Sequence, residues 1–184
     1  MIIETIFSTL DAQGNPNFAP MGIEWGAESV VVRPFRSSKT FRNLAGRGLG
    51  VASLSDDVLA FVRCCLLDEI LPSFPAVTIP GAVFGDACSW IELEVESRAD
   101  SGPGAEFRCR ITHTGRRRDF RGFSRAKNAV IESAILATRL DLLDSGAVAE
   151  DLKRYMNIVN KTGDIQEINA MQIIWEYVEK RGKA

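Results

Sequence analysis

Histidine is scarce in this sequence, and its cysteines lack the spacing of metal ligands. Its 184 residues include one histidine, His113, and four cysteines, none of which occur as Cys-x-x-Cys. Structural metal sites usually need several cysteine or histidine ligands at short spacing, and small secreted folds carry a framework of paired cysteines. The composition therefore predicts neither a metal site nor a disulfide framework.

Strong net charge and long apolar runs are also missing. The formal net charge is −2, which predicts no general attraction to nucleic acid or anionic membranes. No stretch approaches the ~20 consecutive apolar residues of a membrane-spanning helix. Residues 1–5 lack the basic and apolar regions of a secretory signal. We therefore expect a cytoplasmic protein with no membrane or nucleic-acid partner.

What remains is an ordinary globular composition, with 46% hydrophobic and 25% charged residues. A chain of this length buries enough surface to fold without disulfides or metals. The length favours one domain, or one domain with a small appended subdomain.

The first part of the chain has the pattern of an antiparallel meander. Residues rich in β-branched and aromatic types predict strands over 2–9, 17–23, 29–35 and 49–54. Turn-forming residues separate the first three strands at 11–16 and 25–28. Pro20 removes one ladder donor, so the second strand should be an edge, bulged or broken at that point.

A second strand pair follows the middle of the chain. In residues 90–96, three apolar residues alternate with three glutamates, which predicts one buried and one wet face. A turn at 101–104 leads to a strand over 107–113, whose Arg108 and Arg110 are phased to meet the glutamates. The prolines and glycines of residues 71–85 predict an extended loop without regular structure.

Helical patterns dominate the C-terminal part. Three helices are expected after Ser124, and two shorter ones earlier, beginning after Ser37 or Ser38 and after Ser55 or Asp56. Apolar faces are predicted for the second early helix and for the three late helices. In chain order they are Val58, Phe61, Val62, Cys65 and Leu66; Ile131, Ala134, Ile135, Thr138 and Leu142; Val148, Leu152, Tyr155, Met156 and Val159; and Ile168, Met171, Trp175 and Val178. Strands first and helices last predict an α+β architecture.

The segment 33–40 concentrates three cations and three hydroxyls at a strand-to-helix junction. A phosphate suits such a place, because the helix start offers free N–H groups and positive potential. Arg36 can bind two oxygens at once, and Lys39 adds a point charge. The alternative is a solvated helix start with ordinary capping.

Two blocks of the sequence resemble a known family. Residues 15–22 (NPNFAPMG) followed by 34–44 (PFRSSKTFRNL) are similar to the N-terminal half of the FMN-binding split-barrel proteins, and specifically to domain-of-unknown-function family 447. Residues 121–132 (RGFSRAKNAVIE), continuing to 137–140 (ATRL), resemble the second shared block of that family. The resemblance covers most of the chain.

The resemblance implies an antiparallel Greek-key split β-barrel over residues 1–123, with a C-terminal helical subdomain, residues 124–184, packed on it. It also implies a homodimer with FMN near the subunit boundary. The residues implied at the phosphate are Arg36, Ser38, Lys39 and Thr40. Those implied along the isoalloxazine, through backbone groups, are Ala19, Pro20, Met21, Arg33, Pro34 and Phe35, with Asn43 as a further candidate.

The resemblance brings no assigned reaction and no catalytic residue. A flavin-dependent oxidoreductase acting on a small molecule is the first interpretation, because the cofactor itself carries the electrons. A non-catalytic flavin carrier, or a dimeric binding module for an anionic partner, is the alternative. A third possibility is that the phosphate site binds another phosphorylated metabolite.

Other residues have both a structural and a functional interpretation. Arg116–Arg118, with basic residues at 121, 125 and 127, form either an anion-binding patch or a solvated turn. His113 is in phase with neighbouring apolar residues, which favours an inward-facing histidine over a catalytic base. Cys64 and Cys65 lack a visible activating group, so a reactive thiol is not favoured.

Overall fold

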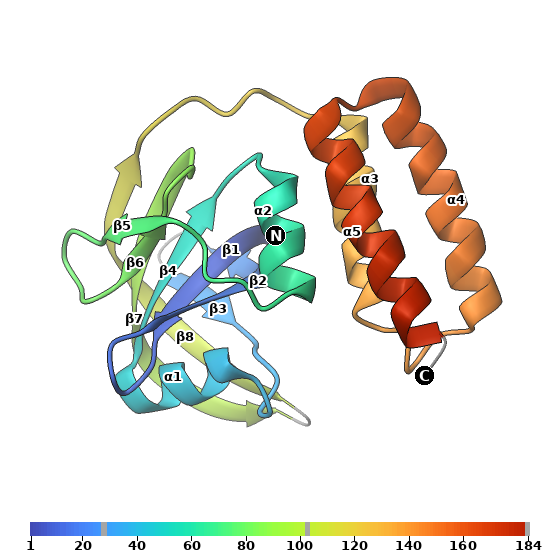
Figure 1. The fold of residues 1–184 in the computed structure, drawn as a ribbon. Coiled ribbons are helices and arrows are strands. Elements are labelled where there is room, and N and C mark those ends of the chain that lie inside the picture. Colours follow the sequence, from blue (N-terminus) through green and yellow to red (C-terminus); the bar gives the residue numbers. More distant parts are fainter. Residues whose placement is uncertain (27–28, 102–103, 183–184) are drawn as a thin grey trace. The chain divides into compact units, whose positions relative to one another are not determined.

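The computed structural model describes residues 1–26, 29–101 and 104–182. Two predicted turns lie partly outside this range, because Ala27 and Glu28 belong to the first and Gly102 and Pro103 to the second. Strands fill most of the first part of the described chain and helices the last part (Figure 1). The predicted α+β class is confirmed.

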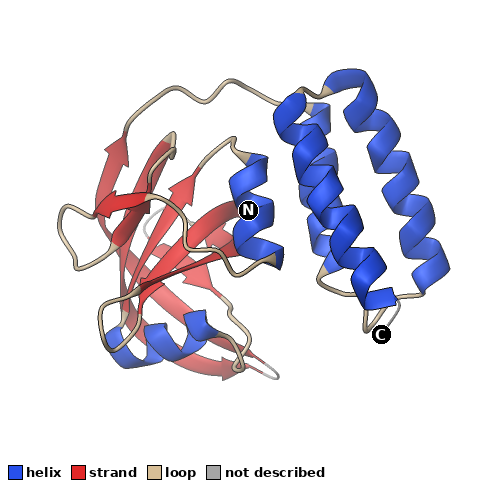
Figure 2. Cartoon of the chain, viewed as in Figure 1, coloured by secondary structure: helices blue, strands red, loops and turns tan. Residues whose placement is uncertain are grey.

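Within the described residues, six antiparallel strands form a closed barrel (Figure 2). They are β1 (Ile2–Leu10), β2 (Pro16–Trp25), β3 (Ser29–Val32), β4 (Leu49–Leu54), β7 (Ser89–Ser101) and β8 (Gly104–Arg116). Their order is β1-β2-β3-β8-β7-β4, and pairing of β4 with β1 closes the barrel. Apolar residues from all six strands and from one helix fill its interior: Phe7, Ile23, Val30, Val32, Leu44, Ala52, Ile91, Leu93, Ala105, Phe107 and Cys109.

Pro20 lies inside β2, which continues through it without a break. It stands opposite Ile6 of β1, whereas the described pairing of β2 with β3 involves only residues 23–25. At Pro20, therefore, β2 has a strand partner on one side only, and the missing N–H is tolerated there as on an edge strand. Of the predicted alternatives, an edge, a bulge or a break, the structure has the edge.

The segment predicted to be an irregular loop contains a small sheet. Residues 73–75 form β5 (Ser73–Pro75) and residues 82–84 form β6 (Ala82–Phe84), which pair antiparallel. The loop prediction was wrong here because Pro75 ends a very short strand, a position where proline costs no interior ladder bond. The hydroxyl of Ser8 in β1 donates to the carbonyl of Ala82, which ties this sheet to the barrel.

One end of the outer face of β7 is covered. Glu92 is 0% exposed, although the alternation predicted a wet glutamate. Its carboxylate accepts hydrogen bonds from the backbone N–H groups of Val77 and Thr78, each at 2.7 Å, in the loop between β5 and β6. Because this contact is nonlocal, the alternation of the strand does not reveal it.

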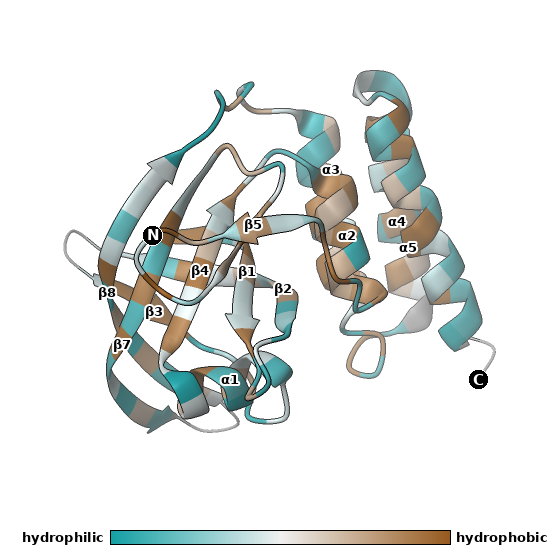
Figure 3. Ribbon diagram, turned by 60° about the vertical axis from the view of Figure 1, so that its left-hand side comes forward, coloured by the Kyte–Doolittle hydropathy of each residue, from teal (hydrophilic) through white to brown (hydrophobic). Residues whose placement is uncertain are grey.

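Farther along the hairpin the outer face is exposed. The alternation of charged and apolar residues along β7 and β8 appears as teal and brown in Figure 3. Arg110 stands opposite Glu94 and forms the predicted ion pair. Arg108 does not meet a glutamate across the hairpin, because a register shift between Val95 and Ser97 places it opposite Ser97.

Helix α1 (Lys39–Arg47) follows β3 after a short connection and contacts β1, β2 and β4. The side chain of Ser38 accepts the N–H of Phe41, which makes Ser38 the N-cap, one of the two predicted candidates. Gly48 ends the helix with φ 67°, a left-handed conformation that glycine adopts at little cost.

The remaining helices belong to a second compact unit. They are α2 (Val58–Leu66), α3 (Arg125–Ala137), α4 (Ser145–Thr162) and α5 (Ile165–Gly182). Side chains of Asp57, Ser124 and Asp144 cap the first three, so the cap of α2 lies one residue beyond the predicted range. In α4, Val148, Leu152 and Val159 are buried as predicted.

The predicted buried face of α3 is partly wrong. Thr138 and Leu142 are exposed and lie beyond the helix. The buried residues of α3 are mostly small: Ala126, Ala129, Val130, Ser133, Ala134 and Ala137. Small side chains suit a helix that packs against α2, α4 and α5 together, whereas the periodicity argument favoured the larger apolar residues. In α2 and α5 the buried positions also shift: Cys64 rather than Cys65 is buried, and Ile168 is 40% exposed.

The described chain folds into two compact units. The first comprises Met1–Ser55 and Ile70–Phe120, and the second comprises Asp56–Glu69 together with the chain from Arg121 onward. Helix α2 thus clusters with the C-terminal helices. A compact unit is not by itself an independent domain, so the division into residues 1–123 and 124–184 stays a prediction. No helix in the described part of the chain has the length and apolarity needed to cross a membrane.

Candidate functional site

The connection from β3 to α1 contains Arg36 and Ser38, two of the four residues predicted to bind a phosphate, and the other two, Lys39 and Thr40, begin the helix. Ser38 holds this connection in shape: its hydroxyl donates to the carbonyl of Phe35 at 2.7 Å and accepts the N–H of Phe41 at 3.1 Å. Its backbone N–H donates to the carbonyl of Phe35 at 3.0 Å. Ser38 therefore shapes the helix start, and its hydroxyl is already engaged.

Thr40 and Asn43 lie on the face of α1 that meets the barrel. Thr40 is 2% exposed, and its hydroxyl accepts a hydrogen bond from Asn17 at 3.4 Å. The amide of Asn43 donates to the hydroxyl of Thr9 at 3.0 Å. Residues three apart share one face of a helix, so these two side chains anchor α1 on β1 and β2.

The cations of the segment point to different partners. Arg33 bridges two carboxylates, with its guanidinium 2.6 Å from Glu24 and 3.0 Å from Glu106. The hydrogen bond with Arg33 lowers the pKa of Glu24. Arg36 lies next to the helix start and Lys39 is its first residue, and both side chains are exposed. The side chain of Arg33 is therefore committed to the barrel surface, while Arg36 and Lys39 remain at the helix start.

A further arginine, which sequence analysis missed, joins Arg36. Arg98, near the end of β7, lies with its Cζ 4.9 Å from the ring centroid of Phe41 in α1. Asp100 forms ion pairs with both arginines at 3.0 Å, and the interaction with Arg36 lowers its pKa most. Nothing in the local pattern of β7 signals this, since the hairpin brings residues 36 and 98 together through space.

The residues predicted to line the isoalloxazine lie on β2 and after β3. Ala19, Pro20 and Met21 are half-buried and pair with β1. The carbonyl of Met21 accepts the hydroxyl of Thr5 at 2.9 Å. In the described pairing β3 stops short of these residues, so their other edge has no strand beside it. Of Pro34 and Phe35, the first is buried and the second is 69% exposed.

Two of the three arginines in the basic segment 116–118 form ion pairs with nearby carboxylates. Arg118 forms two hydrogen bonds with the carboxylate of Asp86, at 3.0 and 3.1 Å. Arg116 pairs with Asp119, and the guanidinium of Arg117 lies 5.4 Å from the ring centroid of Phe74. These contacts favour the interpretation as a solvated turn.

His113 does not keep the predicted phase. A register shift leaves Thr112 as the extra residue on β8, between the pairs formed by Ile111 and His113. His113 is half-buried, with its ring 6.1 Å from that of Trp90. The bulge explains the error, since one inserted residue moves every later side chain to the other face.

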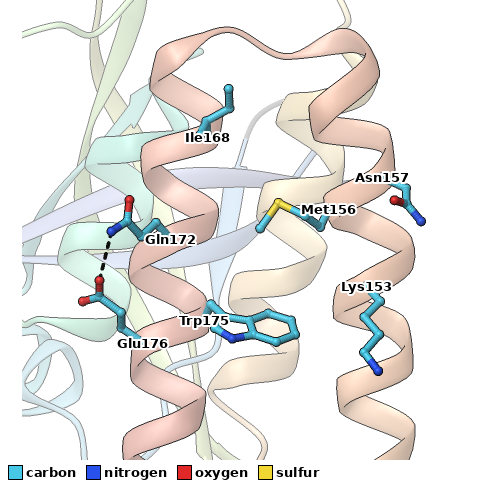
Figure 4. A pocket seen from close by; sticks show the side chains of 7 residues that line it. All are labelled: Lys153, Met156, Asn157, Ile168, Gln172, Trp175 and Glu176. Atoms are coloured by element: carbon cyan, nitrogen blue, oxygen red, sulfur yellow. Dashed lines mark hydrogen bonds between the residues drawn. The ribbon is translucent and has the colours of Figure 1, made fainter.

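A groove of about 790 Å³ opens on the helical unit between α4 and α5. Met156 and Trp175 point toward one another between the two helices, and Lys153 lies beyond them on α4 (Figure 4). Gln172 donates to Glu176 on the α5 wall at 3.1 Å. The groove contains none of the residues predicted to bind a flavin.

Comparisons with known proteins agree with this architecture. A crystal structure of an FMN-bound protein from Methanosarcina mazei, described as a DUF447 protein, matches with a TM-score of 0.86 and 26% identity. The match covers 96% of this chain and 94% of that one. The styrene monooxygenase flavin reductase of Pseudomonas putida S12 matches with a TM-score of 0.53 and 18% identity, covering 62% of this chain and 81% of that one. Flavoredoxin from Methanosarcina acetivorans matches with a TM-score of 0.57 and 13% identity, covering 63% and 69%.

The last two likenesses establish the fold alone, which is the split β-barrel. The chain belongs to the family described as protein of unknown function DUF447: the model of its N-terminal domain matches residues 3–118, and a second model of the family matches residues 124–176. No curated protein matches the chain. The resemblance noted in the sequence is therefore confirmed.

Proposed function

We propose that this protein binds FMN on its barrel unit, with the phosphate at the N-terminus of α1. The observation that carries the proposal is the junction itself, where Ser38 caps the helix and the cations of Arg36, Lys39 and Arg98 lie around its first turn. The FMN-bound relative from Methanosarcina mazei, which aligns with nearly the whole chain, supports the choice of ligand.

The donors at this junction suit a phosphate. The N–H groups of a first helical turn have no acceptors within the helix, and the Ser38 hydroxyl accepts that of Phe41. Lys39 and Thr40 contribute backbone N–H groups and the positive end of the helix dipole, which together favour an anion. The residues that belong to the helix start therefore fit the phosphate end of FMN.

The residues along β2 suit the ring end. Beside Ala19, Pro20 and Met21, one edge of β2 has no strand in the described pairing. The backbone groups that point to this edge can hydrogen-bond to the polar edge of an isoalloxazine. Backbone groups of Arg33, Pro34 and Phe35, in the connection from β3 to α1, are proposed to line the isoalloxazine as well. We assign Ser38, Thr40 and Asn43 to positioning α1, because their side chains are already hydrogen-bonded.

A flavin-dependent oxidoreductase acting on a small molecule is the activity that we favour. FMN, when bound, supplies the electron transfer, and the chain supplies binding, orientation and electrostatics. The alternative, a flavin carrier or a dimeric module for an anionic partner, uses the same site without turnover. The homodimer, with FMN near the subunit boundary, and the cytoplasmic location stay predictions.

The absorbance spectrum of the purified full chain tests the proposal first. We expect a flavin spectrum, release of FMN on heat denaturation, and rebinding of FMN by the stripped protein. A colourless protein that does not bind added FMN would contradict the proposal. Rapid bleaching by a reduced nicotinamide cofactor, followed by reoxidation, separates the oxidoreductase from the carrier, which would bind FMN without turnover.

A further inference from the structure

The side chains of Arg36, Arg98 and Asp100 form a small cluster at the first turn of α1, which we call the arginine seat. The guanidinium Nη2 atoms of Arg36 and Arg98 each lie 3.0 Å from the same carboxylate oxygen of Asp100, Oδ1. One oxygen thus receives two charged donors from two different segments, the connection before α1 and the end of β7.

An aromatic ring fixes the place of both arginines. The Cζ atoms of Arg98 and Arg36 lie 4.9 and 5.9 Å from the ring centroid of Phe41, which belongs to the first turn of α1. Phe41 in turn packs edge-to-face against Phe107 of the barrel core, with ring centroids 5.8 Å apart. Guanidinium groups over aromatic faces are favourable, so the Phe41 ring helps to keep the two cations beside the helix start.

The charge of the seat is unbalanced. Among the ion pairs of the described residues, these two guanidinium groups share one carboxylate, and the Asp100 side chain is 62% exposed. Exposed ion pairs of this kind contribute little to stability, so Asp100 can leave at small cost. A phosphate monoester carries more negative charge and more acceptor oxygens than a carboxylate. It therefore competes well for the same two guanidinium groups.

We propose that Arg98 is a further phosphate-binding residue and that the carboxylate of Asp100 occupies the seat until the phosphate of FMN replaces it. This inference rests on the proposed function and deepens it. Binding then exchanges one anion for another: Arg36 and Arg98 turn from Asp100 to the phosphate, and Asp100 moves into water. Asp100 consequently weakens FMN binding while it keeps two arginines paired in the unliganded protein.

Titration of the stripped full chain with FMN and with riboflavin tests this exchange, because riboflavin lacks the phosphate. Arg98→Ala should weaken FMN binding about tenfold and leave riboflavin binding unchanged. Asp100→Asn should strengthen FMN binding about threefold, because the neutral amide competes poorly for guanidinium groups. Inorganic phosphate should compete with FMN more effectively in Asp100→Asn than in the unaltered chain.

Arg110→Ala is the matched control. Arg110 is an arginine on the same hairpin, also partly exposed, and pairs with Glu94 rather than with Asp100. Its loss should change neither titration, and thermal unfolding should show that all three variants are folded.

The outcomes separate this inference from the proposed function. Unchanged FMN affinity in Arg98→Ala, or weaker FMN binding in Asp100→Asn, overturns the inference while FMN binding by the unaltered chain still stands. Failure of the unaltered chain to bind FMN overturns both.

Discussion

The indole Nε1 of Trp90 donates a hydrogen bond to the carboxylate of Glu92, two residues along the same strand, at 3.1 Å. The hydroxyl and N–H of Thr78 each donate to the same carboxylate at 2.7 Å. Glu92 therefore joins the strand β7 to the loop between β5 and β6. A buried carboxylate with this many donors is stabilising only while it is ionised and fully bonded.

Replacing this carboxylate should destabilise the barrel. In Glu92→Gln the side chain keeps one acceptor oxygen. Its NH2 group is a donor, so it cannot accept hydrogen bonds from the N–H groups that it faces. We expect a loss of about 2 kcal/mol in the free energy of unfolding, measured by urea denaturation at neutral pH. Glu94→Gln, at an exposed position paired with Arg110, should change this free energy by less than about 1 kcal/mol.

The effect of Glu92 should depend on pH. Burial by itself raises the pKa of Glu92, but the hydrogen bonds from Val77, Thr78 and Trp90 lower it to about 2. A glutamate in an unfolded chain titrates near ~4.3. A lowered pKa in the folded state means that the stabilisation is complete above the unfolded pKa and is lost as the pH falls toward 2. The difference between the unaltered chain and Glu92→Gln should therefore shrink from pH 5 to pH 3, and a constant difference would contradict this assignment.

Gly115 of β8 lies against the Trp90 ring, and a side chain there should be costly. A Cβ atom at residue 115 would stand 2.0 Å from Cζ2 of Trp90, and Trp90 is 8% exposed. Gly115→Ala should lower the free energy of unfolding by about 2 kcal/mol through overpacking. Gly46→Ala is the control, because nothing lies within 4 Å of its Cβ and alanine favours the helix. Equal stability of the two variants would contradict this prediction, because it would mean that the Trp90 ring can move aside without cost.

The thiols should differ in reactivity. Burial raises the pKa of the Cys64 thiol, and burial raises that of Cys109 to about 12. Since the thiolate is the reactive form, we expect both to resist alkylation at pH 8 in the folded protein and to react after denaturation. Mass spectrometry of the labelled peptides measures this by site, with half-buried Cys65 as the internal comparison. Fast labelling of Cys64 would contradict its burial.

Local patterns predicted much of the fold. The strands, the cap at Ser38 and the ion pair of Arg110 with Glu94 follow from alternation, turn chemistry and capping, all of which act over a few residues. The two sequence blocks also identified the family correctly. These signals are strong because they depend on residues that are near one another in the chain or directly across a hairpin.

Nonlocal contacts account for most of the rest. The burial of Glu92 depends on a loop some 14 residues away, and the meeting of Arg98 with Phe41 depends on how the hairpin passes the helix. The phase of His113 changed because of a bulge, which leaves no clear mark in the sequence. Such features require the positions of other segments, and one sequence supplies none of them.

Binding of FMN by the variant Arg36→Ala/Lys39→Ala is the most direct test of the phosphate site. We compare its affinity for FMN with that of the unaltered chain, using Arg47→Ala, at the last turn of the same helix, as the control for charge. We expect the double variant to stay folded and to bind FMN about 100-fold more weakly, while Arg47→Ala binds as the unaltered chain does. Equal FMN affinity in all three proteins would contradict a phosphate site at this helix start.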